Sequence, residues 1–131
     1  MRKDRILKLA EFVEKLPRRK LDMRVVGVLN GGKKLDPVRC RSAACAMGWA
    51  TVVFPRDFQF HNDDLKGHIT PKWRRPRSDD DSIVVISQFM GIPRSDAQVL
   101  FGIGKPGYRT PRQVAAGLRK YAETQELPGQ L

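Results

Sequence analysis

The longest run of residues without a charged side chain begins at Ser42, and within it Pro55 ends the helical pattern after Phe54. Ala44 and Gly48 lie four residues apart, so a helix here would have a face of small side chains that another backbone can approach closely. Ser42 is a suitable N-cap because its hydroxyl can accept a hydrogen bond from a free amide of the first turn. Helices that are apolar on every side are buried. The pattern therefore predicts a central, buried helix over this run.

Apolar residues spaced by three and four predict further helices on either side of it. One covers residues 4–16, and another covers 82–90 with Gly91 as the glycine that follows a helix end. Ser95 can cap a short helix that ends before Gly102. Thr110 followed by Pro111 and a glutamine at the third helical position matches a capping box, which predicts a last helix.

Strand patterns are shorter. The β-branched segment 23–29, the turn sequence after it and a return through 33–35 predict a hairpin, and 58–60 alternates like a third strand. Residues 61–81 contain glycine and prolines without a regular period, so we expect an irregular, basic loop there. The tail 126–131 is expected to fray.

These elements predict a single α+β domain over residues 1–131. It has four to five helices around the apolar helix at about 42–54 and a small antiparallel sheet of two or three strands. A chain of 131 residues with 40% hydrophobic and 30% charged residues fits one globular domain. The N-terminus has no apolar segment of the secretory type, because charged residues interrupt it, so we expect a cytoplasmic protein.

Charge is the strongest indication of function. The formal net charge is +11, and residues 1–77 carry 19 Lys and Arg against 8 Asp and Glu, whereas 78–131 carry 6 of each. Such an asymmetric field attracts nucleic acid or an acidic protein surface. The side chains expected to make these contacts are Arg18, Arg19, Lys20, Lys33, Lys34, Lys72, Arg74, Arg75 and Arg77.

Trp73 lies among the cations of the predicted loop. Its indole can stack on an unpaired base while the neighbouring cations contact phosphates. It can equally anchor the loop to the core, with the arginines in water, since charge runs are commonly solvated surfaces. The sequence leaves both interpretations open.

Metal binding and catalysis find little support. Cys40, Cys45, His61 and His68 supply zinc-binding atoms, but the spacing between the cysteines is too long for a tight zinc knuckle, so packing is the better role for Cys45. No phosphate-binding loop, nucleophile elbow or paired-histidine motif is present in the sequence. We therefore expect no enzyme activity and no cofactor.

Residues 86–101 match the outline of a helix-turn-helix. A recognition helix presents several polar residues to base edges, whereas the second helix here offers only Asp96 and Gln98 beside apolar neighbours. A helical hairpin that packs on the core is the better interpretation.

The segment 40–50, with its Ala-Cys-Ala-Met-Gly-Trp-Ala sequence from Ala44, resembles a helix found in small uncharacterised proteins of phages and bacteria. The resemblance extends in outline to Leu21-Asp22-Met23, the Gly91 turn and the helix after Thr110, although Arg41 stands where that family usually has glycine. It implies no known activity, but a phage origin is compatible with a small protein that acts on host machinery.

The function expected from these observations is non-enzymatic binding of nucleic acid through the surface of residues 1–77. The alternative is a phage-encoded inhibitor that binds a host protein, such as a CRISPR effector or another nucleic-acid enzyme. A structural or assembly component of a virion is a third hypothesis.

Overall fold

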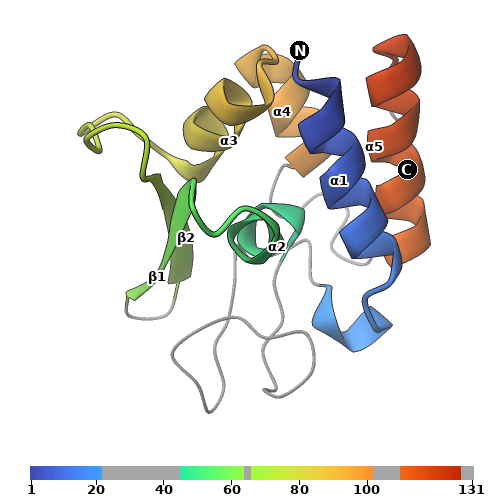
Figure 1. Ribbon diagram of the computed structural model, residues 1–131, viewed down its shortest axis with the longest axis horizontal. Coiled ribbons are helices and arrows are strands. Elements are labelled where there is room, and N and C mark those ends of the chain that lie inside the picture. The colour runs from blue at the N-terminus through green and yellow to red at the C-terminus, as the bar shows by residue number, and fades with distance from the viewer. Residues whose placement is uncertain (22–44, 64–65, 102–109, 128–131) are drawn as a thin grey trace.

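The computed structural model describes residues 1–21, 45–63, 66–101 and 110–127. They form an α+β fold with a two-stranded antiparallel sheet, as predicted (Figure 1). Within these residues no helix is both long and apolar enough to cross a membrane. In chain order the elements are α1 (Lys3–Glu14), the 3-10 turn η1 (Arg18–Lys20), α2 (Ala46–Val53), β1 (Phe58–Asp63), β2 (Lys66–Pro71), α3 (Ser82–Met90), α4 (Arg94–Phe101) and α5 (Pro111–Thr124).

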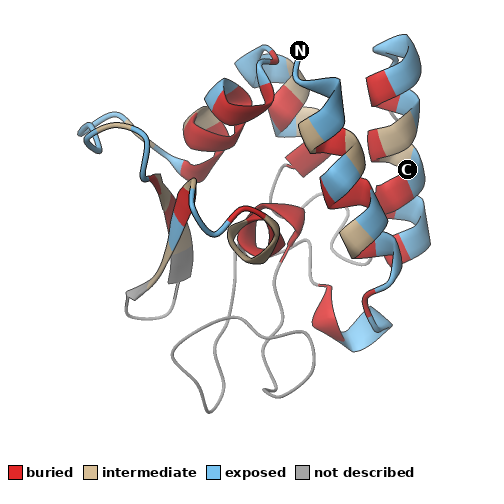
Figure 2. Ribbon diagram, in the orientation of Figure 1, coloured by how far each residue is buried: buried red, intermediate tan, exposed pale blue. Residues whose placement is uncertain are grey.

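Helix α2 lies at the centre of the described fold, between α1 and the β1–β2 hairpin (Figure 1). Its first five residues are buried, in agreement with the prediction of a buried central helix (Figure 2). Trp49 is fully buried, its ring lies 5.9 Å from that of Phe12, and its indole N–H donates to the Lys20 carbonyl at 2.7 Å. The indole therefore joins α2 to α1 and η1.

The predicted start of this helix is wrong. The helix begins at Ala46, because Cys45 has an extended backbone (φ −74°, ψ 176°) and its carbonyl accepts the first helical hydrogen bond, from the Trp49 amide. The predicted cap, Ser42, lies outside the described residues. An apolar run with no capping side chain near its true start gives the sequence no marker for the first turn.

The helices around α2 bury the faces that the spacing of their apolar residues predicts. Helix α1 buries Ile6, Leu9, Ala10 and Val13 and packs along α5, with an ion pair between Arg119 and Glu14 (Figure 2). The capping box of α5 forms as predicted: the Gln113 amide donates to the Thr110 hydroxyl, and the Thr110 amide donates to the Gln113 side chain.

Helices α3 and α4 form the predicted helical hairpin, and α4 buries Ala97, Leu100 and Phe101. Gly91 ends α3 with φ +66°, a left-handed conformation that glycine adopts at low cost. The predicted cap at Ser95 is wrong, because α4 already begins at Arg94 and its Ala97 amide donates to the Pro93 carbonyl. Proline at that position starts the helix one residue before the hydroxyl side chain.

The expectation of an irregular segment at 61–81 is wrong for its first half. Strands β1 and β2 pair in an antiparallel hairpin in which Phe58 faces Pro71 and Phe60 faces Ile69. Gly67 and Pro71, which suggested a break, occupy positions near the two ends of β2, where loss of one donor or one side chain is tolerated. The predicted strands at 23–29 and 33–35 and the tail from 128 lie outside the described residues.

Candidate nucleic-acid interface

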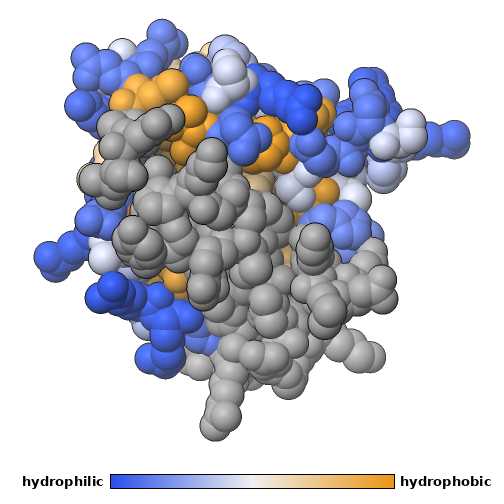
Figure 3. All heavy atoms as spheres, turned by 180° about the vertical axis from the view of Figure 1, so that it is seen from behind, coloured by the Kyte–Doolittle hydropathy of each residue, from blue (hydrophilic) through white to orange (hydrophobic). Residues whose placement is uncertain are grey.

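The segment 72–77 leads from β2 towards α3, and we call it the basic loop. It projects from the rest of the molecule at the upper left of Figure 1, and hydrophilic side chains dominate the same region seen from behind (Figure 3). Its residues are exposed apart from Arg74. The loop is therefore accessible to a large partner.

Trp73 belongs to an aromatic cluster whose other members are Phe54, Phe58 and Phe89. Its ring meets Phe58 edge-on at 5.6 Å and 78°, and it lies 5.6 Å from Phe89 at a tilt of 35°. Even so, 42% of the residue remains exposed. The predicted packing of this tryptophan on the core is confirmed, while stacking on an unpaired base stays a prediction for the part of the residue that faces solvent.

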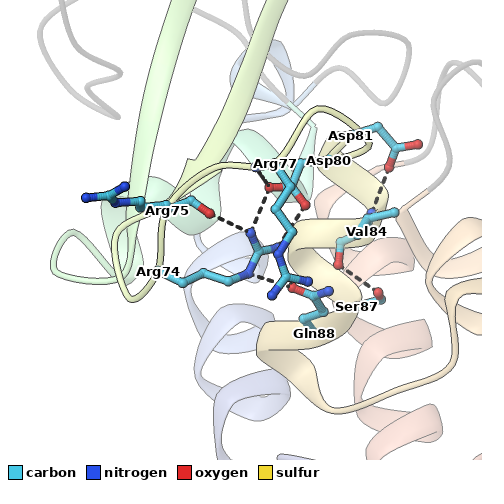
Figure 4. Close-up of polar contacts among 8 residues, drawn as sticks. All are labelled: Arg74, Arg75, Arg77, Asp80, Asp81, Val84, Ser87 and Gln88. Atoms are coloured by element: carbon cyan, nitrogen blue, oxygen red, sulfur yellow. Dashed lines mark hydrogen bonds and ion pairs between the residues drawn. The ribbon is translucent and has the colours of Figure 1, made fainter.

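Arg74 holds the loop against α3 (Figure 4). Its two terminal nitrogens donate to the two carboxylate oxygens of Asp80, each at 2.8 Å, and it also donates to the Gln88 side-chain oxygen. The Asp80 side chain is only 6% exposed and the Arg74 side chain 16%. This fork pairs the positive charge of Arg74 with a carboxylate of the protein itself.

The same contacts shift the pKa values of Asp80 and Arg74. Hydrogen bonds from the Arg74 guanidinium and the Arg77 amide lower the pKa of Asp80 to about 2, and the carboxylate raises the pKa of Arg74. Asp81 has a different role: it caps α3 by accepting from the Val84 amide, and it pairs with Arg94. Asp80 is therefore engaged by the basic loop, whereas Asp81 stabilises the start of α3.

Among the described residues, the other cations of the loop have no such partner. Lys72 donates to the Pro55 carbonyl at 2.8 Å, while the Arg75 side chain points away from the Arg74–Asp80 contact (Figure 4). Within the described residues, no carboxylate forms an ion pair with Lys72, Arg75 or Arg77. Their positive charges are therefore available to an external anion.

Two further cations adjoin the aromatic cluster from α1, and sequence reasoning missed them. The Arg5 guanidinium lies 4.0 Å from the centre of the Phe89 ring and donates to the Phe89 carbonyl at 2.7 Å. Lys8, which is exposed, lies 5.4 Å from the Phe54 ring. The available signal was their spacing of three residues on the polar side of an amphipathic helix, but the sequence does not show that this side adjoins the loop.

The structure does not bring all of the predicted cations together. Arg18 and Arg19 are exposed on η1, at the side of the molecule opposite the basic loop (Figure 1). Lys20 is buried, with 3% exposure, so it is unsuited to contact a phosphate backbone. Lys33 and Lys34 lie outside the described residues. The described candidates therefore form two separate groups.

The histidines and the described cysteine do not assemble a metal site. His61 and His68 face each other across the hairpin with rings stacked 4.8 Å apart, and His61 Nε2 is 2.7 Å from the Thr70 hydroxyl. Cys45 is buried at the start of α2, and Cys40 lies outside the described residues. In the described ranges, no three potential ligands come together.

Comparisons with known proteins add no relative: no protein-family model, no curated protein and no solved structure matches this chain. The geometry of the basic loop and the aromatic cluster is therefore the basis for a functional assignment.

Proposed function

We propose that this chain is a small, non-enzymatic basic protein of the cytoplasm that binds nucleic acid through the phosphate backbone. The observation that carries the proposal is the projecting loop, which carries the exposed cations Lys72, Arg75 and Arg77 and, next to Lys72, a Trp73 that is 42% exposed. Phosphates that bind these cations release condensed counterions, which is the main source of affinity in sequence-independent binding.

The aromatic ring favours nucleic acid over a merely acidic protein. A carboxylate-rich surface satisfies the three cations but gives the exposed indole no specific contact. A nucleotide supplies a phosphate for the cations and a flat base for the ring. Both features of the loop are then used by a single ligand.

One observation favours the alternative of a phage-encoded inhibitor that binds a host protein. Asp79 is exposed beside the basic loop and forms no ion pair within the described residues. This carboxylate repels a phosphate backbone, whereas a protein surface of mixed charge can accommodate it. A host nucleic-acid enzyme, including a CRISPR effector, is a partner of this kind.

Binding to mixed RNA and DNA at two salt concentrations tests the proposal. A steep loss of affinity at the higher salt is expected if the loop cations contact phosphates. Arg75→Glu should weaken binding strongly, whereas Arg112→Glu, the same change at an exposed position on α5, should have a smaller effect. No binding at low salt contradicts the proposal.

A pull-down from host lysate with and without nuclease separates the alternatives. If nucleic acid is the ligand, nuclease treatment removes the material that the protein captures, and the protein binds purified nucleic acid when this is supplied in its place. A protein that remains bound after nuclease treatment, and whose capture Arg75→Glu abolishes, supports the inhibitor instead.

A further inference from the structure

The two neighbours of Trp73 are both fixed to the body of the protein. On one side the Lys72 amide donates to the Asp57 carbonyl at 2.9 Å and its ammonium donates to the Pro55 carbonyl. On the other side Arg74 forms its fork with Asp80. The indole between them is therefore held at the surface from both directions along the chain.

The ring itself is oriented by packing. Phe58 meets it edge-on, and Phe89 lies beneath it at a tilt, with Arg5 at 4.0 Å from the Phe89 ring. Phe58 and Phe89 are in turn packed against each other, with centroids 4.6 Å apart. An aromatic side chain held in this way loses little conformational entropy when a ligand stacks on it.

The exposure of Trp73 is thus maintained by the structure. Among the described residues, the other large hydrophobic side chains with comparable exposure are Met1 and Leu127, both near the ends of the chain. Trp73 instead lies in a loop whose flanking contacts are specific. Beside it in the sequence lie Lys72 and Arg75, whose positive charges form no ion pair with any carboxylate in the described part of the chain.

We propose that Trp73 is a stacking platform for an unpaired base, so that the ligand of this surface is single-stranded nucleic acid. This inference rests on the proposed function and specifies its ligand. In a duplex the base faces are stacked within the helix and only phosphates and base edges are accessible, so the indole gains nothing from it. In a single strand every base offers a face, which makes the contact tolerant of sequence.

Equilibrium binding to a 15-nucleotide oligothymidine and to a DNA hairpin duplex of equal charge tests the inference. The single strand should bind more tightly and should quench the fluorescence of Trp73. Trp73→Leu keeps an apolar side chain but removes the stacking face, and it should weaken single-strand binding roughly tenfold to a hundredfold. It should leave duplex binding and the dependence on salt unchanged.

Trp73→Phe is the control that keeps a smaller stacking face, and it should retain part of the single-strand preference. Circular dichroism of each variant verifies that the fold is intact. Equal binding of both ligands, unaffected by Trp73→Leu, overturns the inference and leaves phosphate binding in place. Failure of the wild-type protein to bind either ligand at low salt overturns the proposed function as well.

Discussion

The two tryptophans allow the same substitution at a buried and at an exposed position. In Trp49→Phe the Lys20 carbonyl loses the indole donor, and removing one partner of a buried hydrogen bond costs about 1–3 kcal/mol. The smaller ring also leaves a cavity of roughly 40 Å³, which at about 24 cal/mol per Å³ adds about 1 kcal/mol. We therefore expect the free energy of unfolding to fall by about 2–4 kcal/mol.

Trp73→Phe is the matched control. The ring is 42% exposed and its N–H donates to no group in the described part of the chain, so we expect a loss below about 1 kcal/mol. Urea unfolding followed by circular dichroism measures both variants. With a slope of about 2 kcal/mol per molar urea, the midpoint of Trp49→Phe should fall by about 1–2 M and that of Trp73→Phe by less than about 0.5 M.

Equal shifts in the two midpoints would refute this reasoning, because they would show that the hydrogen bond of Trp49 to η1 adds nothing. A larger shift for Trp73→Phe would show that the basic loop, rather than α2, is the main stabilising element.

Three further predictions concern local contacts. The pKa of Asp80 is about 2 in the folded protein, below its ordinary value of 3.8. Its contribution to stability is therefore present above about pH 4 and is lost between about pH 4 and pH 2. The urea midpoint of Asp80→Asn should depend less on pH over this range than that of the wild-type protein. Gly91→Ala should lower the unfolding free energy by about 1–2 kcal/mol because φ is +66°, whereas Gly91→Asn, which tolerates this conformation, should lose less. Thr110→Ala should cost about 1 kcal/mol in the same assay, and Thr110→Ser should cost much less, since serine keeps the hydroxyl that caps α5.

Elements with local signals were predicted well from the sequence. The apolar stripe of α1, the glycine after α3 and the capping box of α5 each depend on residues within about one or two turns of one another. Strand β2 was missed because its stability depends on pairing with β1, and its own residues include Gly67 and Pro71. The start of α2 was misplaced because its first turn has no polar cap.

The candidate site shows the same limit. The sequence identifies Trp73 and its neighbouring cations, but it does not show that Arg74 pairs with Asp80 inside the protein. A turn in which the Asp80 amide donates to the Arg77 carbonyl at 3.1 Å brings Asp80 back to Arg74. The contribution of Arg5 depends on α1 packing beside Phe89, which no local pattern reveals.

The dependence of affinity on salt tests the central claim most directly. If Lys72, Arg75 and Arg77 each neutralise one phosphate of a single strand, the logarithm of the binding constant should fall with the logarithm of salt concentration with a slope of about −2. Removing one cation in Arg75→Ala should reduce this slope to about −1.4. A slope near zero, or one that Arg75→Ala leaves unchanged, would contradict the assignment of the basic loop as a phosphate-binding surface.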